Sequence, residues 1–550
     1  MSLSSRLIGW AASLAPADTY DVAIERNIAV PMPDGVVLLA DHYYPYPRRG
    51  GKPPTILVRS PYGRAGTWGM FFARPFAERG FQVLVQSCRG TFGSGGKFDA
   101  FHNERADGLA TLAWLQQQTW FSGELATIGP SYLGFVQWAI AAEAGSVLKA
   151  MVPQVTASEF RSLTYAGESF GLDSALTWIH LLSHQEDAPP AALVAFVRTA
   201  GTLGAALNHL PLREADETAV GKPVPFFREW LEHNAPGDEW WKPVDWSGSV
   251  SRITAPVHLI GGWYDIFLPY MIADYTRLRQ AGRQPYLTIG PWTHTHPGLM
   301  LASVRESTIW CRAHVLGDRS RLRESPVRVW VMGANKWEDF PAWPPAGYPA
   351  QRWHLHAGKR LGRAIPAESA PDHYRYDPAD PTPAVGGSSL SQNSGPKDNR
   401  SLEARPDVLL YSSDPLERDV EVIGPIRVEL YVRSTVEHTD FFARLCDVDP
   451  SGRSTNICDG LLRLWPGHPM PEADGCLKLD LDLWPTAHRF LRGHRIRVQV
   501  SSGAHPRFAR NPGSGEPLAT ATKLVAAEQS VYHDPDHPSA IILPTRAELP

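Results

Sequence analysis

The sequence predicts an α/β core that is interrupted by a helical insertion and followed by an all-β domain. Strand-like apolar runs alternate with helical patterns over residues 1–149, and this alternation returns over residues 251–349. Residues 150–250 between them have a mostly helical pattern, which is typical of a cap inserted into a core. Over residues 350–550 short strands follow at turn-like spacing, as in a jelly roll or another β-sandwich.

The composition excludes several classes of protein. The 550 residues are 43% hydrophobic and 20% charged, which is typical of a globular chain and not of a disordered or fibrous one. The 53 basic and 57 acidic residues give a net charge of −4, so we expect no nucleic acid and no anionic membrane as a partner. No apolar run reaches the ~18 residues that span a bilayer. Size and charge balance permit a monomer or a homodimer.

The N-terminus and the cysteines indicate a cytoplasmic protein. Residues 7–15 form a short apolar stretch after Arg6, as in a weak signal peptide, but Trp10 and Pro16 favour an amphipathic helix. Five cysteines are too few for a disulfide scaffold, so we expect free thiols, with one disulfide in the C-terminal region left open. They show no CxxC spacing, which disfavours a structural zinc site, and we expect no metal and no cofactor.

The core is expected to begin with a hairpin and to continue as a parallel sheet. Residues 20–45 hold two apolar runs around Asp34-Gly35, a strong hairpin signal. Further strands are expected at 55–59, 81–86, 126–129, 256–261, 285–290 and 326–332, and helices at 71–79, 104–117, 133–144 and 272–281. In the β-domain the predicted strands are 427–433, 440–445 and 495–500.

The strongest chemical signal is the segment Thr127-Ile-Gly129-Pro-Ser131-Tyr-Leu-Gly134. A strand ends and a helix begins around Ser131, and G-x-S-x-x-G is a variant of the nucleophile elbow. Small residues are needed because the sharp turn strains the serine backbone and leaves no room beside it. The turn lifts the hydroxyl out of the sheet at a helix N-terminus, which favours negative charge. An ordinary strand–helix turn with a capping serine is the alternative.

A serine nucleophile needs a base, and the base needs an orienting acid. One returning strand ends in Gly261-Gly-Trp-Tyr-Asp265 and another runs into Gly290-Pro-Trp-Thr-His294. The order Ser, Asp, His and the positions after strands are those of α/β-hydrolases. Asp265 as a helix N-cap is the alternative reading, and His296 competes with His294, which we favour.

The oxyanion that forms during acyl transfer needs two hydrogen-bond donors. The backbone N–H of Tyr132, at the start of the elbow helix, is one candidate. The loop Arg59-Ser-Pro-Tyr62-Gly-Arg64 follows an earlier strand, and the hydroxyl of Tyr62 is the second candidate. Without the other motifs, Tyr62 would be interpreted as a surface aromatic residue.

Together these motifs resemble the cocaine esterase / X-prolyl dipeptidyl-peptidase superfamily of serine hydrolases, the CocE/NonD family. Besides the segments quoted above, the similar segments are Cys88-Arg-Gly-Thr-Phe-Gly-Ser-Gly-Gly, Arg497-Val-Gln-Val-Ser-Ser and Pro506-Arg-Phe-Ala-Arg-Asn511. The resemblance covers nearly the whole chain. It implies an α/β-hydrolase core, a helical cap, a C-terminal jelly roll, the triad Ser131, Asp265 and His294, and Tyr62 in the oxyanion hole. Many members have Asp before the Arg-Gly, where this chain has Ser87-Cys88, and we expect that difference to affect local packing only.

The resemblance implies substrates that are esters, N-terminal dipeptides ending in proline, or amino-acid esters and β-lactam side chains. A free amine needs carboxylates to hold its ammonium, and the resemblance to the related α-amino acid ester hydrolases implies that these would closely follow the catalytic Asp. The segment Ile266-Phe-Leu-Pro-Tyr270 after Asp265 contains no acid. We therefore expect a carboxylesterase that forms an acyl-enzyme and accepts a neutral acyl group. The expected aromatic contacts with the substrate are Trp263, Phe267, Phe170 and Trp178.

Two alternatives remain open. Acids in the cap, namely Glu168, Asp173 and Asp187, could hold an ammonium, so an X-Pro dipeptidyl-peptidase or an amide or β-lactam acylase is the first alternative. The second is a carbohydrate-binding protein with an inactive hydrolase core, which the presence of all three triad residues disfavours.

Overall fold

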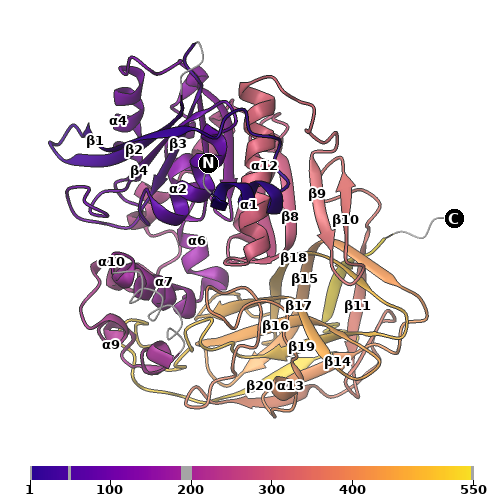
Figure 1. The fold of residues 1–550 in the computed structure, drawn as a ribbon. Coiled ribbons are helices and arrows are strands. Elements are labelled where there is room, and N and C mark those ends of the chain that lie inside the picture. The colour runs from indigo at the N-terminus through magenta and orange to yellow at the C-terminus, as the bar shows by residue number, and fades with distance from the viewer. Residues whose placement is uncertain (1–2, 47–50, 188–200, 547–550) are drawn as a thin grey trace. The chain divides into compact units, whose positions relative to one another are not determined.

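The computed structural model describes residues 3–46, 51–187 and 201–546, and the chain divides into two units (Figure 1). The first unit consists of Met1–Phe160, Glu239–Gly262 and Phe267–Val327. The second consists of Arg161–Asp238, Trp263–Ile266 and Arg328–Pro550. Most of the predicted cap therefore belongs to the same unit as the β-domain, and its residues 188–200 lie outside the described residues.

The first unit is built on the predicted, largely parallel sheet. Its strands are β1 (Val22–Pro31), β2 (Val37–Pro45), β3 (Thr55–Ser60), β4 (Gln82–Ser87), β5 (Leu125–Pro130), β6 (Leu148–Gln154), β7 (His258–Tyr264) and β8 (Tyr286–Thr293). They lie in the order β1-β2-β4-β3-β5-β6-β7-β8. The two strands of the β1–β2 hairpin are antiparallel, and β2 also pairs antiparallel with β4. Strands β4, β3, β5, β6 and β7 run parallel to one another.

Helices cover this sheet. They are α1 (Leu3–Ala11), α2 (Gly66–Phe72), α3 (Arg74–Ala77), α4 (Glu104–Gln116), α5 (Tyr132–Ala141), α11 (Leu268–Gln280) and α12 (Pro297–Val315). Helix α5 packs against β3, β5 and β6, and the long α12 packs against β5, β6 and β8. Figure 1 shows α12 beside β8. The short N-terminal helix that the sequence predicts is confirmed as α1.

Three local predictions for this unit were wrong or missing. The helix predicted at 71–79 is two helices, because the backbone leaves helical geometry at Ala73 (φ −121°, ψ −64°) and Pro75 sits in the first turn of α3, where proline is tolerated. Strand β6 was assigned to the cap, since a short apolar run does not distinguish a strand from a buried helix. Helix α12 was not predicted.

The second unit contains the predicted all-β domain. Its strands are β11 (Ala350–His356), β12 (Arg360–Gly362), β13 (Asp372–Tyr376), β14 (Leu409–Ser412), β15 (Val420–Ser434), β16 (Thr439–Val448), β17 (Ser454–Leu464), β18 (Leu477–Phe490), β19 (Arg495–Ser501), β20 (Ala527–Tyr532) and β21 (Ala540–Pro544). Strands β9 (Val327–Val331) and β10 (Lys336–Phe340) belong instead to the ten-stranded sheet that also holds β1–β8. The long β15 pairs antiparallel with β18, β20 and β21. The strands predicted at 427–433, 440–445 and 495–500 are confirmed as parts of β15, β16 and β19.

The helices of the predicted cap are bound to loops of the β-domain. They are α6 (Arg161–Thr164), α7 (Leu172–His184), α9 (Ala215–Val220) and α10 (Pro225–Glu232), and α13 (Arg400–Glu403) lies within the β-domain itself. The N–H of Asp173 donates to the carbonyl of Pro506 over 3.0 Å, and the N–H of Ala509 donates to the carbonyl of Phe170 over 2.8 Å. The segment 506–511, singled out in the sequence, thus holds the start of α7.

Short 3₁₀ turns lie at Gly145–Val147, Ala166–Glu168, Leu212–Glu214, Glu239–Val244 and Ser247–Arg252. All five cysteines are buried free thiols, so the disulfide left open by the sequence is not formed. Within the described residues, no helix combines the length and the apolar character that crossing a membrane requires.

A buried ion cluster lies inside the β-domain. Arg444 on β16 has no exposed side-chain surface and donates from Nε and Nη2 to Oδ2 of Asp459 over 3.0 and 2.8 Å. Asp459 on β17 also accepts from Arg507. Burial by itself would raise the pKa of Asp459, but the two guanidinium groups hold it below its usual value of 3.8. The carboxylate therefore stays ionised and pairs two cations.

We expect Asp459→Asn to lower the free energy of unfolding at pH 7 by about 3–5 kcal/mol, because it leaves two buried guanidinium groups without their anion. Since the folded-state pKa of Asp459 is depressed, its stabilisation is complete above pH 3.8 and is lost as the pH falls through the lower folded-state value. Urea denaturation at pH 7 and at pH 3 measures both effects.

Asp380→Asn is the matched control, because Asp380 forms an ion pair with Arg405 while 81% of its side chain is exposed. It should change stability by less than about 1 kcal/mol. Equal stabilities of Asp459→Asn and the control at pH 7 would contradict the role given to the buried cluster.

Candidate active site

Ser131 lies where β5 ends and α5 begins, in a strained backbone conformation. Its φ of 58° and ψ of −124° lie in a region that residues with a side chain rarely adopt. The Ser131 N–H donates to the carbonyl of Gln154 on β6 over 2.8 Å, and the Ser131 carbonyl accepts from Phe135 in the first turn of α5. These bonds hold the turn that the sequence predicted.

The glycines of the motif are required by close packing. A Cβ at Gly129 would lie 2.5 Å from Cβ of Leu133, and a Cβ at Gly134 would lie 2.4 Å from the side chain of Thr156. Both contacts are shorter than carbon atoms allow. The helix can therefore pack close against the sheet only with glycine at these two positions.

A buried polar network fixes the first residue of α5, and the sequence did not reveal it. The Tyr132 hydroxyl donates to Oε1 of Glu104 over 2.8 Å and accepts from the N–H of Phe101 over 2.9 Å. Arg59 forms a 2.9 Å ion pair with Glu104, and both side chains are almost fully buried. Arg59 stands at the start of the Tyr62 loop motif. That position was the one sequence signal that could have indicated a role for Arg59 in positioning the site.

The loop that carries Tyr62 is held by several polar contacts. Tyr62 is half-buried, its N–H donates to Oγ of Ser60 over 3.0 Å, and its ring stacks on Trp68 with centroids 5.5 Å apart. The ring centroids of Tyr62 and Tyr132 are 6.4 Å apart. The structure thus brings together the two residues predicted to donate to an oxyanion.

The residues that depart from the family motif, Ser87 and Cys88, lie close to this loop and to Glu104. Arg64 donates to Oδ1 of Asp41 and to Oγ of Ser87, each over 3.0 Å. Cys88 is buried with its Sγ 3.6 Å from Oε2 of Glu104. Ser87-Cys88 therefore belongs to the packing below the loop.

The two candidate histidines occupy different positions. His294 directly follows β8, is half-buried, and its ring centroid lies 5.6 Å from that of Phe267. His296 is exposed and caps α12, with its Nδ1 accepting the N–H of Gly298 over 3.0 Å. The capping role of His296 favours His294 as the base, and the assignment stays a prediction.

Asp265 directly follows β7 and is 1% exposed. It belongs to the segment Trp263–Ile266 of the second unit, and its predicted contact with His294 stays a prediction. Trp263 beside it is buried, and its indole N–H donates to the carbonyl of Trp330 over 2.7 Å. Gly262 of the same motif is required because a Cβ there would lie 2.3 Å from the carbonyl oxygen of Trp292.

The two aromatic residues predicted in the cap differ in exposure. Phe170 has no exposed surface and packs beside Tyr165 and Phe227, with ring centroids 5.5 and 5.8 Å away. Trp178 on α7 is half-buried and stacks on Trp230 at 5.9 Å. Both lie in the second unit, and their contact with a substrate stays a prediction.

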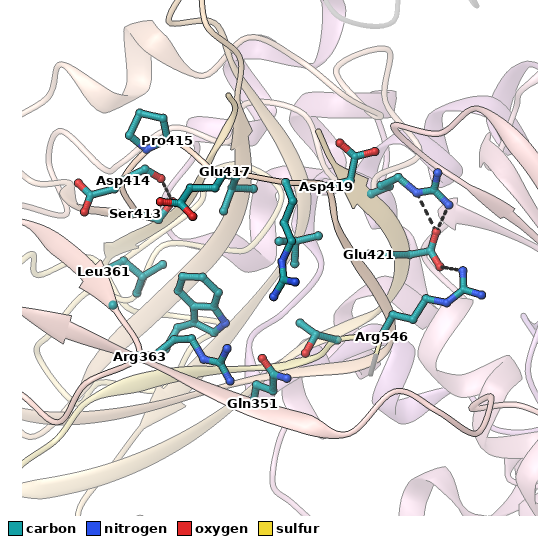
Figure 2. A pocket seen from close by; sticks show the side chains of 17 residues that line it. Gln351, Leu361, Arg363, Ser413, Asp414, Pro415, Glu417, Asp419, Glu421 and Arg546 are labelled. Atoms are coloured by element: carbon teal, nitrogen blue, oxygen red, sulfur yellow. Dashed lines mark hydrogen bonds and ion pairs between the residues drawn. The ribbon is translucent and has the colours of Figure 1, made fainter. Parts of the chain in front are cut away.

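A pocket of about 600 Å³ lies in the β-domain, between β11, β12 and the loop before β15 (Figure 2). Figure 2 shows Glu421 at one side, where it accepts from Arg489 and Arg546. Gln351, Arg363 and Glu417 also line it. None of the residues that line this pocket is a histidine or a cysteine, so they offer no activated nucleophile.

Comparison with known proteins places the chain in a family. Residues 34–296 match the family model of the X-Pro dipeptidyl-peptidase (S15 family), and residues 321–542 match the X-Pro dipeptidyl-peptidase C-terminal non-catalytic domain. The chain is 31% identical to a cocaine esterase of Rhodococcus sp. (strain MB1 Bresler), over 96% of this chain and 98% of that protein.

Solved structures share the fold over nearly the whole chain. An α-amino acid ester hydrolase superposes with a TM-score of 0.79 at 21% identity, covering 97% of this chain and 98% of its own. An aminopeptidase from the marine sediment archaeon Thaumarchaeota archaeon superposes with a TM-score of 0.78 at 21% identity, covering 96% and 97%. The 31% identical relative and the two family models show that the chain belongs to the cocaine esterase and X-Pro dipeptidyl-peptidase family of hydrolases.

Proposed function

We propose that this hydrolase is a serine carboxylesterase with the triad Ser131, His294 and Asp265. The observation that carries the proposal is the left-handed backbone of Ser131 at the end of β5. Strain of this kind persists where the surrounding structure imposes it, and it presents the hydroxyl at the positive end of a helix. The positions of Asp265 after β7 and His294 after β8 support the remaining roles.

The proposed mechanism is acyl transfer through a covalent intermediate. His294 takes the Ser131 proton as the oxygen attacks the ester carbonyl, and Asp265 holds the imidazole and stabilises its cation. His294 then gives the proton to the leaving alcohol, and the acyl group remains on Ser131. A water molecule, deprotonated by His294, attacks the acyl-enzyme and releases the carboxylic acid and the free serine.

The tetrahedral oxyanion would be held by the Tyr132 N–H and the Tyr62 hydroxyl. The Tyr132 hydroxyl is not available for this role, because it already donates to Glu104. Burial and the neighbouring Glu104 carboxylate raise the pKa of Tyr132 well above its usual value of 10, so this hydroxyl stays neutral and stays in that bond. The network therefore positions the backbone N–H of Tyr132 at the start of the helix.

A neutral acyl group is favoured by the surroundings of His294. The ring of Phe267, a predicted pocket residue, lies beside the imidazole, with centroids 5.6 Å apart. We retain Trp263 and Trp178 in the proposed pocket and leave out Phe170, since a ring without exposed surface offers nothing to a substrate.

Two of the three cap acids that could hold an ammonium, Glu168 and Asp173, already have partners. Both oxygens of Glu168 accept from Arg161, over 3.2 and 2.7 Å. Asp173 is buried and accepts from Oγ of Ser389 over 2.6 Å and from Thr177 over 3.2 Å. Asp187 is exposed at the end of α7. A paired carboxylate is a weaker site for a second cation, so these contacts support an ester over a peptide substrate.

The relatives support the same order of preference. The name of the 31% identical protein denotes an ester substrate, and that protein aligns with almost this whole chain. The S15 match keeps the dipeptidyl-peptidase as the second candidate. Five buried free thiols suit a reducing compartment, and we propose a cytoplasmic enzyme that acts on small esters as a monomer or a homodimer.

Ser131→Ala should lower kcat/KM for p-nitrophenyl acetate by at least ~10³-fold, because it removes the nucleophile. His294→Ala should cause a similar loss. His296→Ala is the matched control and should retain activity within a few-fold, since His296 only caps α12. Equal activity of Ser131→Ala and the parent protein would overturn the proposed function.

Tyr62→Phe should lower kcat for the same ester by about 10²–10³-fold with little change in KM, because the lost donor acts on the transition state. Steady-state kinetics measure the two constants separately. Tyr46→Phe, at a tyrosine that is 60% exposed, is the control. A Tyr62→Phe enzyme that changes only KM would show that Tyr62 binds substrate and does not stabilise the oxyanion.

The substrate class is tested by a paired assay of p-nitrophenyl butyrate and Gly-Pro-p-nitroanilide. We expect rapid ester cleavage and no dipeptide release, both compared with Ser131→Ala. Efficient release from Gly-Pro-p-nitroanilide would contradict the esterase proposal and assign an ammonium site to the chain. In that case Glu168→Gln and Asp173→Asn would identify the acid by a rise in KM for the peptide alone.

A further inference from the structure

A cluster of three different metal-binding side chains lies at one end of the β15 sheet. The ligand atoms of Asp474, Cys476 and His537 all lie within 4.8 Å of one another. Asp474 and Cys476 lie in the turn before β18, and His537 lies in the loop between β20 and β21. Pairing of β15 with β18 at Val432–Leu477 and with β20 at Tyr431–Tyr532 brings these two distant segments together.

The imidazole of His537 is already oriented as a metal ligand would be. Its Nδ1 faces the carboxylate of Asp534, at 3.1 and 3.2 Å from the two oxygens, and its Nε2 lies 3.1 Å from Oδ2 of Asp474. A carboxylate on one ring nitrogen fixes the tautomer and leaves the other nitrogen for a metal. Asp534 itself accepts from the N–H groups of Asp536 and His537, over 3.0 and 2.9 Å.

The other two ligands are also held in place. Asp474 accepts the N–H of Cys476 on Oδ1 over 2.9 Å, which leaves Oδ2 facing His537. Cys476 has no exposed surface, and its Sγ makes only weak contacts with backbone carbonyls, the nearer being Val432 at 3.4 Å. Rings of Tyr431 and Tyr532 pack on the imidazole, with centroids 5.5 and 5.3 Å away.

The geometry and the charge fit a divalent ion. The ligand atoms lie within 4.8 Å of one another, and on a tetrahedral ion with bonds of about 2.0–2.3 Å they would be about 3.3–3.7 Å apart, so the thiol moves inward by about 1.5 Å at most. Arg433 also contacts Oδ2 of Asp474, at 3.0 Å. A carboxylate oxygen has two lone pairs, one for the guanidinium and one for a metal ion. A thiolate and the carboxylates of Asp474 and Asp534 outnumber the single guanidinium of Arg433, so the surroundings favour a divalent cation.

We propose that Asp474, Cys476 and His537 bind a zinc ion that joins the turn before β18 to the loop between β20 and β21. Thiolate, imidazole and carboxylate are the donor set that zinc prefers, and a water molecule completes the four ligands. Binding replaces the thiol proton by the metal and releases that proton to solvent. The site lies in the β-domain and serves its loops, so it is independent of the proposed hydrolase triad.

The test uses the full chain without an affinity tag, because histidine tags bind zinc. After treatment with EDTA, the protein is incubated with ZnCl₂, passed through a desalting column and analysed for metal by mass spectrometry. We expect one zinc per chain in the parent protein and in Cys446→Ala, a control at another buried thiol of the same domain. Cys476→Ala and His537→Gln should retain almost none.

Two further measurements keep the test decisive if a ligand variant folds poorly. Asp534→Asn retains all three ligands and should weaken zinc binding about 10–100-fold in competition with a chromophoric chelator. Cobalt in place of zinc in the parent protein should give a thiolate-to-metal absorption band. Absence of retained zinc in the parent protein, equal zinc in Cys476→Ala, or a cobalt spectrum without that band would each overturn the proposal.

Discussion

The strained turn at Ser131 is the feature on which the rest of the first unit depends. A non-glycine residue at φ 58° is kept there by bonds from β6 and α5 and by glycines that let the helix approach the sheet. Beneath the turn, Arg59 and Glu104 form a buried ion pair that binds the hydroxyl of Tyr132. One buried network therefore connects the Tyr62 loop, α4 and the first residue of α5. Tertiary packing of this kind stabilises the strained backbone at Ser131.

The second unit is organised by a comparable constraint. Two buried guanidinium groups, on Arg444 and Arg507, share the carboxylate of Asp459. Arg507 belongs to the same segment whose backbone binds the start of α7 through Pro506 and Ala509. The cap helices and the β-domain are thereby one unit, although the cap is inserted into the sequence of the core. Ser389 of the β-domain pairs with Asp173 of the cap, whereas Glu168 is paired within the cap by Arg161.

The outline of the fold could be predicted because its signals are local. The Asp34-Gly35 turn between apolar runs gave the β1–β2 hairpin, and alternating patterns gave β3, α4, β5 and α5. The prediction failed where local patterns are ambiguous. The apolar run of β6 is equally compatible with a buried helix. The break between α2 and α3 at Ala73 depends on the packing around Pro75 rather than on the helix propensity of the residues. The unit to which the cap belongs depends on contacts with residues hundreds of positions away.

By itself the sequence determined the order of the motifs, and with it the residues proposed as nucleophile, acid and base, because an elbow and strand-end positions are short-range patterns. Only the tertiary structure decided that Tyr132 is held by Glu104, that His296 caps a helix, and that Glu168 and Asp173 of the cap are already paired. Cysteine spacing disfavoured zinc, yet Cys476 lies beside His537 because both flank β15. Side-chain partners distant in sequence are chosen by strand pairing and burial, which a linear pattern does not contain.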